Sequence, residues 1–249
     1  MKVVALVSGG KDSTYNMMKC VEDGHEIVAL AHAHPPEDAT NEEMDSFLFQ
    51  TVGSSAVGTI AECMGVPFYH AEIRGTAVTQ TLDYELTQGD ETEDLFLLLK
   101  QVMENHPEVG AVSVGAIFSS YQANRVQHVC DRLGLKMLAY LWHREQVALL
   151  REMVGSGVRA ILIKVAAYKL GQDDLGKTLE EMEPKLVALS DKYGIHACGE
   201  GGEFESFTLD CPLFSRRIVI DECHPVVHSQ SEDAPVVYLR ITKVHTEPK

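Results

Sequence analysis

The first half of the chain alternates short apolar runs with segments of helical periodicity, and this alternation constrains the fold most strongly. The apolar runs lie at residues 3–7, 27–33, 66–70, 109–114 and 135–141. Short continuous apolar runs are typical of strands buried on both faces, as in parallel sheets. Helical patterns fill the gaps between the runs, at 12–21, 54–64, 95–103 and from Ser119 or Ser120 to about 133. We therefore predict an α/β fold with a doubly wound, parallel five-stranded sheet. Ligands of such sheets bind outside the carboxyl ends of the strands, so we expect the loops 8–13, 31–42, 71–76 and 115–122 to face a ligand.

The pattern changes near residue 142, which predicts two domains, 1–141 and 142–249. In the second part we expect a helix over 145–154 and a strand over 158–166. Pro184 suits the first turn of a helix that ends near Tyr193. Two short strand-like pieces follow, at 218–220 and 236–241. This mixture predicts a smaller α+β domain.

Charge and cysteine content limit the partners and the compartment. The 249 residues include 21 Lys and Arg against 37 Asp and Glu, a formal charge of −16. Such a chain is not expected to bind nucleic acid through phosphates or to bind an anionic membrane surface. The sequence shows no signal-peptide pattern and no apolar run of about 18 residues. Its six cysteines form no C-x-x-C pair, so we predict a cytoplasmic location. Oligomeric state is not readable from the sequence.

Ser8-Gly9-Gly10-Lys11-Asp12-Ser13 lies between the first predicted strand and the first predicted helix. Two glycines allow a tight turn whose N–H groups point into one concavity, and the following helix adds the positive end of its dipole. Lys11 adds a full positive charge. The segment is not a Walker A loop, because Ala5 and Asp12 occupy positions that need Gly and Ser or Thr. We predict an anion site here, against the alternative of a plain strand–helix turn.

This hexapeptide resembles the S-G-G-x-D-S loop of the N-type ATP pyrophosphatases, the PP-loop superfamily, whose domains have the HUP fold of adenine nucleotide α-hydrolases. The resemblance implies ATP cleavage between the α and β phosphates, with Mg2+ as cofactor. It implies catalytic roles for Lys11, Asp12 and Ser13, and a metal contact for Asp12. The implied ATP-binding residues are Ser8, Gly9, Gly10, Lys11, Asp12, Ser13, Ala29, Leu30 and Ala31.

Three further segments, 115–125, 140–142 and 199–207, narrow the resemblance to the diphthine–ammonia ligases. They read GAIFSSYQANR, YLW and GEGGEFESF. The resemblance implies that ATP adenylates the diphthine carboxylate of translation elongation factor 2 and that ammonia then displaces AMP to give diphthamide. No cysteine here has the setting of a glutaminase nucleophile, so free ammonium is the expected donor. The implied substrate-binding residues are Gly115, Ser119, Tyr121, Gln122, Arg125, Glu200, Glu203 and Glu205.

Several alternatives stay open at this point. The three glutamates suit a trimethylammonium group, ammonium or Mg2+, or simply a solvated acidic hairpin. Tyr121, Phe204 and Trp142 suit cation–π contact or ordinary packing. Arg125 suits an anion or is an exposed helix charge. A zinc site is disfavoured by ligand spacing. As a whole, the chain could instead be a PP-loop enzyme that modifies tRNA, or a nucleotide sensor without activity.

Overall fold

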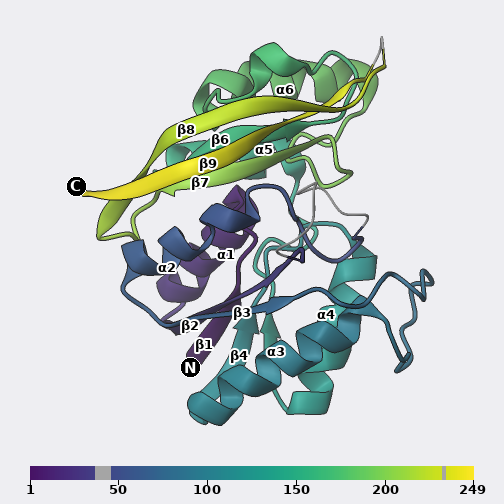
Figure 1. Ribbon diagram of the computed structural model, residues 1–249, viewed down its shortest axis with the longest axis vertical. Coiled ribbons are helices and arrows are strands. Elements are labelled where there is room, and N and C mark those ends of the chain that lie inside the picture. Colours follow the sequence, from purple (N-terminus) through teal and green to yellow (C-terminus); the bar gives the residue numbers. More distant parts are fainter. Residues whose placement is uncertain (37–45, 232–233) are drawn as a thin grey trace.

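A five-stranded parallel sheet forms the first half of the protein, as predicted (Figure 1). The computed structural model describes residues 1–36, 46–231 and 234–249, so part of the loop expected over 31–42 lies outside the described residues. The strand order is β3-β2-β1-β4-β5. The bounds are β1 Lys2–Leu6, β2 Glu26–His34, β3 Phe68–Glu72, β4 Val109–Ser113 and β5 Lys136–Leu138. The chain order reverses between β1 and β4, and ligands bind at such switch points in doubly wound sheets.

Helices cover both faces of this sheet, because alternate residues of its strands are apolar on both sides. Val3 and Ala5 of β1 belong to one buried cluster and Val4 to another. The first cluster includes side chains of α1 and α2, and the second includes side chains of α3 and α4. The helix bounds are α1 Lys11–Glu22, α2 Gly58–Met64, α3 Glu91–Asn105 and α4 Ser120–Leu133, with a 3-10 turn, η1, at Ser54–Ala56.

A four-stranded antiparallel sheet, ordered β7-β6-β9-β8, forms the second half. Its strands are β6 Arg159–Val165, β7 Phe204–Asp210, β8 Arg216–Ser229 and β9 Val236–Pro248. The helices α5 Gln146–Gly155 and α6 Leu179–Tyr193 belong to this half, with a 3-10 turn, η2, at Gln172–Asp174. The sheet stacks over α1 and α2 (Figure 1), and its inward side chains join the first cluster. One continuous apolar core therefore links the two sheets.

The second half departs most from expectation. β8 and β9 form a long hairpin where two short pieces were predicted, and β7 was not predicted. Pro184 is the sixth residue of α6 rather than part of its first turn. The helix begins earlier because Thr178 accepts a hydrogen bond from the Glu181 N–H, while the Glu181 carboxylate accepts one from the Thr178 N–H. This capping box outweighs the single backbone hydrogen bond that Pro184 cannot donate.

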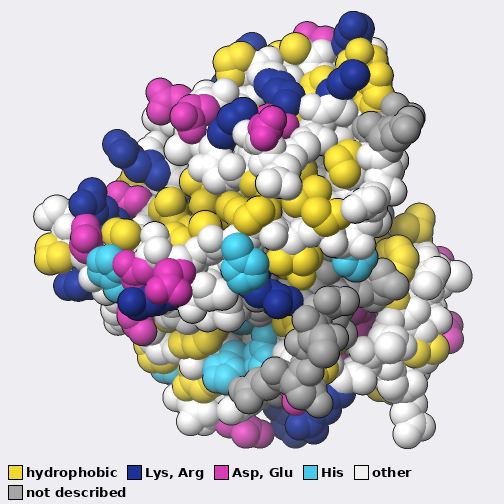
Figure 2. Space-filling model, turned by 45° about the horizontal axis from the view of Figure 1, so that its top comes forward, with side chains coloured by type: hydrophobic (Ala, Val, Ile, Leu, Met, Phe, Trp, Pro, Cys, Tyr) yellow, Lys and Arg dark blue, Asp and Glu magenta, His cyan; other side chains and the backbone are white. Residues whose placement is uncertain are grey.

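The surface carries charges of both signs, and the cysteines are not paired in disulfides. On the face shown in Figure 2, Lys and Arg side chains are scattered among acidic ones rather than gathered into one basic patch. All six cysteines are free thiols, and five of them are buried. Burial raises the pKa of the Cys198 thiol to about 12, as expected of a packing residue. Within the described residues, no helix is long and apolar enough to cross a bilayer.

Candidate active site

A cavity of about 530 Å³ lies at the carboxyl ends of β1, β2 and β4. Its walls come from residues 6–8, 11–13, 31–33 and 114–116, and from 199–202 and 204–206 of the second half. Residues 46–50 and single residues of α3 and α4 or its cap, at 95, 98, 119, 122 and 126, complete the lining. Of the four loops expected to face a ligand, three contribute and 71–76 does not. A cavity of this size suits a small ligand such as a nucleotide.

The predicted PP-loop, residues 8–13, forms a tight turn that opens α1 toward this cavity. Gly9 has a φ of +92°, a conformation that favours glycine. Inside the turn the Gly10 N–H donates to Ser8 Oγ at 3.3 Å and the Ser13 hydroxyl donates to the Gly10 carbonyl at 3.1 Å. No side chain caps the helix at Gly10. The Lys11 N–H is bonded elsewhere, so the N–H groups of Asp12 and Ser13 are the candidate donors to an anion in this first turn.

Gly115 allows the loop after β4 to pass directly against the PP-loop. A Cβ at this position would lie 2.6 Å from the Ser13 nitrogen and 2.7 Å from the Asp12 carbonyl carbon. Both contacts are with backbone atoms, which cannot rotate away. The role expected for Gly115 was substrate binding; its position shows that it also sets the distance between two walls of the cavity.

The PP-loop is also bonded to β7 of the second sheet. The Lys11 N–H donates to Ser206 Oγ at 3.1 Å, and the Thr208 N–H donates to the Gly9 carbonyl at 2.8 Å. The hydroxyls of Thr14 and Thr208 lie 3.1 Å apart. The second half of the chain therefore holds the loop in place as well as enclosing the cavity.

The Lys11 ammonium is buried between the PP-loop and residues 199–207, here called the acidic segment. Its Nζ donates to Asp12 Oδ2 at 2.8 Å and to the Cys198 carbonyl at 2.5 Å, and lies 4.9 Å from the Phe204 ring centre. The side chain is only 2% exposed. Burial opposes the charge, but the Asp12 carboxylate and other nearby acidic groups hold the pKa of Lys11 above its usual value. The ammonium makes two hydrogen bonds, so one of its three donors is still available.

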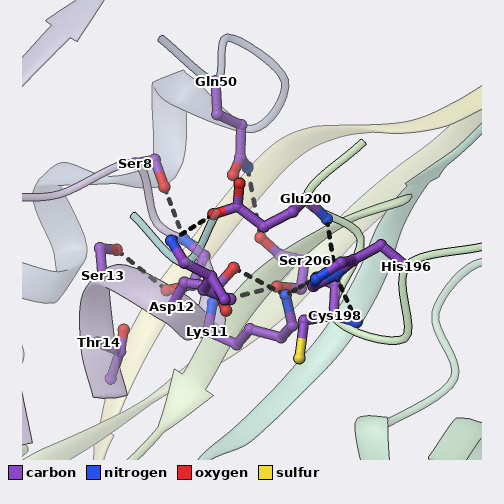
Figure 3. A network of polar contacts seen from close by, with 12 residues as sticks. Ser8, Lys11, Asp12, Ser13, Thr14, Gln50, His196, Cys198, Glu200 and Ser206 are labelled. Carbon is purple, nitrogen blue, oxygen red and sulfur yellow. Dashed lines mark hydrogen bonds and ion pairs between the residues drawn. The ribbon is translucent and has the colours of Figure 1, made fainter. Parts of the chain in front are cut away.

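Glu200 faces Lys11 and Asp12 from the acidic segment (Figure 3). Its Oε1 accepts a hydrogen bond from the Ile117 N–H at 2.6 Å. Burial, with the Asp12 charge as a smaller cause, raises the pKa of Glu200 above that of an ordinary glutamate. Asp12 Oδ1 is buried and has no hydrogen-bond partner among the described residues. The carboxylate oxygens of Asp12 and Glu200 therefore lie beside the backbone N–H groups of the PP-loop.

The other two glutamates of the segment have different surroundings. Glu203 does not line the cavity; its carboxylate accepts hydrogen bonds from the His196 N–H at 2.7 Å and the Gly201 N–H at 2.8 Å. Glu205 does line the cavity and pairs with Lys164 at 3.0 Å. Glu203 shapes the turn, and Glu200 is the glutamate best placed to meet a ligand.

The residues of β2 that line the cavity are 31–33, two positions further along the chain than the predicted 29–31. Ala29 and Leu30 are fully buried in the sheet and do not line the cavity, whereas Ala31, His32 and Ala33 do. The His32 ring lies 2.8 Å from the Val7 carbonyl through Nδ1 and 2.5 Å from the Ser54 hydroxyl through Nε2. Burial lowers the pKa of His32 to about 4. The ring is therefore neutral at pH 7, with Nδ1 donating and Nε2 accepting.

Two of the four residues expected from α4 reach the cavity. Ser119 caps the helix by accepting from the Gln122 N–H at 3.3 Å, and both residues line the cavity. Tyr121 and Arg125 do not. Arg125 is fully buried, donates to the carbonyls of Thr79 and Thr81, and stacks 3.3 Å from the Tyr121 ring centre. Its position matches neither an anion ligand nor an exposed helix charge.

The remaining candidates are occupied by other contacts. Trp142 packs edge-on against His143, and the Phe204 ring lies beside Lys11. Residues 46–50, which the sequence did not single out, line the cavity; they carry no motif, so only the fold reveals them. Within the described residues, no cluster of three or more His, Cys, Asp or Glu side chains could hold a metal.

These features define a class: an α/β protein with a PP-loop at the switch point of a parallel five-stranded sheet, facing a carboxylate-lined cavity. The chain belongs to the diphthamide synthase family. Residues 1–137 match the family model described as the diphthamide synthase N-terminal domain, and residues 145–242 match the one described as its C-terminal domain.

Curated relatives agree with this family. The chain is 57% identical to diphthine–ammonia ligase of Danio rerio, over 100% of this chain and 98% of that protein. It is 55% identical to diphthine–ammonia ligase of Mus musculus, over 100% of this chain and 94% of that protein. A solved U34-tRNA thiolase, NcsA of Methanococcus maripaludis, is 14% identical over 82% of this chain and 70% of its own, with a TM-score of 0.35. A likeness at that score supports no functional argument.

Proposed function

We propose that this protein is an ATP-dependent ligase that joins ammonia to the carboxylate of diphthine on translation elongation factor 2. The observation that carries the proposal is the cavity, in which an anion-binding turn and the Glu200 carboxylate face one another. Relatives matched over 94% and 98% of their own length are named diphthine–ammonia ligase, which supports diphthine and ammonia as the substrates; the elongation factor as carrier is part of the proposal.

In the first step a diphthine carboxylate oxygen attacks the α-phosphorus of ATP. The bond from that phosphorus to the bridging oxygen breaks, giving an acyl-adenylate and pyrophosphate. The N–H groups of Asp12 and Ser13 at the start of α1 and the Ser8 hydroxyl, which only accepts a hydrogen bond within the loop, are the donors for the departing pyrophosphate. The remaining Lys11 donor adds a positive charge that burial keeps from being screened.

In the second step ammonia attacks the acyl carbon, AMP leaves with the bonding electrons, and one proton is released. Ammonium must lose a proton before it can attack. Glu200 is the group we assign to this role, because its raised pKa brings it closer to the pKa range of an effective base. The Ile117 N–H fixes the Glu200 carboxylate in the cavity wall, where ammonium would meet it.

The donor set also fits magnesium. Asp12 Oδ1 is a buried carboxylate oxygen with no partner among the described residues, and magnesium prefers oxygen ligands. A single protein carboxylate is enough when ATP phosphates and water supply the other ligands. Asp12 would hold the ion, which when bound neutralises phosphate charge.

The product pattern tests the proposal. Wild-type protein, given ATP, ammonium and elongation factor 2 bearing diphthine, is expected to form AMP, pyrophosphate and amide in equal amounts. Omitting the factor or the ammonium should abolish amide formation. Formation of ADP, or no turnover with the complete mixture, would contradict the proposal. Asp12→Asn, which is close to isosteric, is expected to lower turnover at least 100-fold while the thermal midpoint stays near that of the wild type.

A further inference from the structure

The segment between β3 and α3 exposes an unusual amount of apolar side chain. Residues 76–89, here called the rim loop, contain no helix or extended strand. Three of their aliphatic side chains are more than half exposed: Val78 at 55%, Leu82 at 59% and Leu86 at 66%. In Figure 1 this segment projects from the body of the molecule beside α4. Solvent-facing loops usually carry polar side chains, so clustered aliphatics need an explanation.

The rim loop is held firmly in spite of its irregular backbone. The Arg125 guanidinium donates to the carbonyls of Thr79 and Thr81 and lies between two tyrosine rings, 3.3 Å from Tyr121 and 5.2 Å from Tyr84. Burying a whole guanidinium is costly unless its partners are fixed in place. The apolar side chains are therefore presented on a fixed support.

Further hydrogen bonds fix the rim loop at three points between residues 79 and 84. The Thr79 N–H donates to Asp90 Oδ2 at 3.1 Å, and the Asn124 amide donates to the Leu82 carbonyl at 3.0 Å. The Tyr84 hydroxyl donates to Glu93 at 2.9 Å. Side chains of α3 and α4 thus hold the loop, while its aliphatic side chains remain directed to solvent.

The rim loop adjoins the cavity through Tyr121. The Tyr121 hydroxyl donates to the Thr79 carbonyl at 3.5 Å, and its ring centre lies 5.7 Å from that of Phe47. Phe47 is itself 54% exposed and lines the cavity. The Gln122 side chain, also in the cavity wall, donates to the Phe47 carbonyl at 3.4 Å. Tyr121 therefore joins the exposed Phe47 ring of the cavity wall to the backbone of the rim loop, which places the loop beside the cavity.

We propose that the rim loop and Phe47 dock the protein that carries the diphthine side chain. This inference rests on the proposed function. The substrate side chain belongs to a folded protein, which cannot enter a cavity of about 530 Å³, so its body must cover the mouth. A fixed apolar surface beside that mouth supplies the affinity that one modified side chain cannot. Arg125 is then a positioning residue: it holds the rim loop rather than contacting the reacting atoms.

A double variant, Leu82→Ser with Leu86→Ser, tests the proposal. The KM for the protein substrate is expected to rise about tenfold or more, with an unchanged kcat and an unchanged Kd for ATP. The matched control is Val227→Ser, because Val227 is 49% exposed on β8 of the other sheet; its KM should equal that of the wild type. Thermal midpoints of all three proteins should agree closely, because the substituted side chains are exposed.

Each other outcome overturns a specific claim. An unchanged KM, or a fall in kcat or ATP affinity, rejects docking by the rim loop while the proposed function stands. Self-association of the wild type that the double variant loses, with the same KM, shows that the surface joins two copies of this chain instead. Absence of turnover in the wild type rejects the proposed function, and the docking proposal with it.

Discussion

Gly115→Ala should separate the geometry of the PP-loop from the stability of the fold. The added methyl would lie 2.6 Å from the Ser13 nitrogen, whereas ordinary contacts begin near 3.4 Å. The two segments must therefore move apart by about 0.8 Å. The backbone of Gly115 is not left-handed, so alanine itself fits the conformation and the contact is the whole effect. Overpacking of this kind costs about 1–3 kcal/mol, or about 2–12 °C in the thermal midpoint of a chain this long.

The effect on catalysis should be larger than the effect on stability. A displacement near 1 Å at a reacting centre lowers rates by about 100-fold, because the donors of the PP-loop no longer meet the phosphates in line. We expect kcat/KM for ATP to fall by about that factor, measured as pyrophosphate release at saturating protein substrate and ammonium. The Kd for a non-hydrolysable ATP analogue, measured by calorimetry, should rise in parallel.

Gly110→Ala is the matched control, since it makes the same change in β4 where an added Cβ meets nothing within 4 Å. It should keep wild-type kcat/KM and gain up to about 1 kcal/mol of stability, because alanine suits a strand better than glycine. Wild-type kcat/KM and ATP affinity in Gly115→Ala would refute the claim that this contact sets the loop position.

Two further substitutions test the buried charges. Glu200→Gln keeps an acceptor for the Ile117 N–H but removes the base, so kcat should fall about 100-fold. Because the folded pKa of Glu200 is raised, its ionised form destabilises the native state above that pKa; the variant should melt higher than the wild type at pH 8 and equally near pH 4. Arg125→Met should cost about 3 kcal/mol and speed amide exchange over 76–89, because buried carbonyls lose their donor. Arg217→Met, at an exposed ion pair, should cost under about 1 kcal/mol.

The sequence predicts the first half of the fold well, because strands that are buried on both faces appear in it as short continuous apolar runs. The run 3–7 and the helix after it are confirmed as β1 and α1, and the cap expected at Ser119 or Ser120 lies at Ser119. The PP-loop could be placed because its residues are contiguous and its anion chemistry is local. The same reasoning located the cavity at the carboxyl edge of the sheet.

The second half is less predictable because its strands are exposed or carry charge. β8 has a run of five exposed residues from Asp221 to Pro225, so hydrophobic periodicity is lost along most of it. β7 begins within the acidic segment, where three glutamates spaced by glycines suited a loop or a solvated hairpin instead of a strand. Arg125 could not be assigned from spacing, since its partners are backbone carbonyls some 44 residues earlier in the chain. Tertiary contacts of this kind leave no trace in local sequence.

Lys11 connects the candidate anion site of the PP-loop with the acidic segment that faces it. Lys11 is the one cation of the PP-loop, yet its ammonium is directed at the Cys198 carbonyl and Asp12. A buried lysine without acidic neighbours would lose its proton. Asp12, with a smaller contribution from Glu200, therefore holds the pKa of Lys11 up, and Lys11 in turn lowers the cost of burying Glu200. Because Ser206 and Thr208 hold the same loop from β7, the anion site is completed by the second sheet, and the first sheet alone cannot supply it.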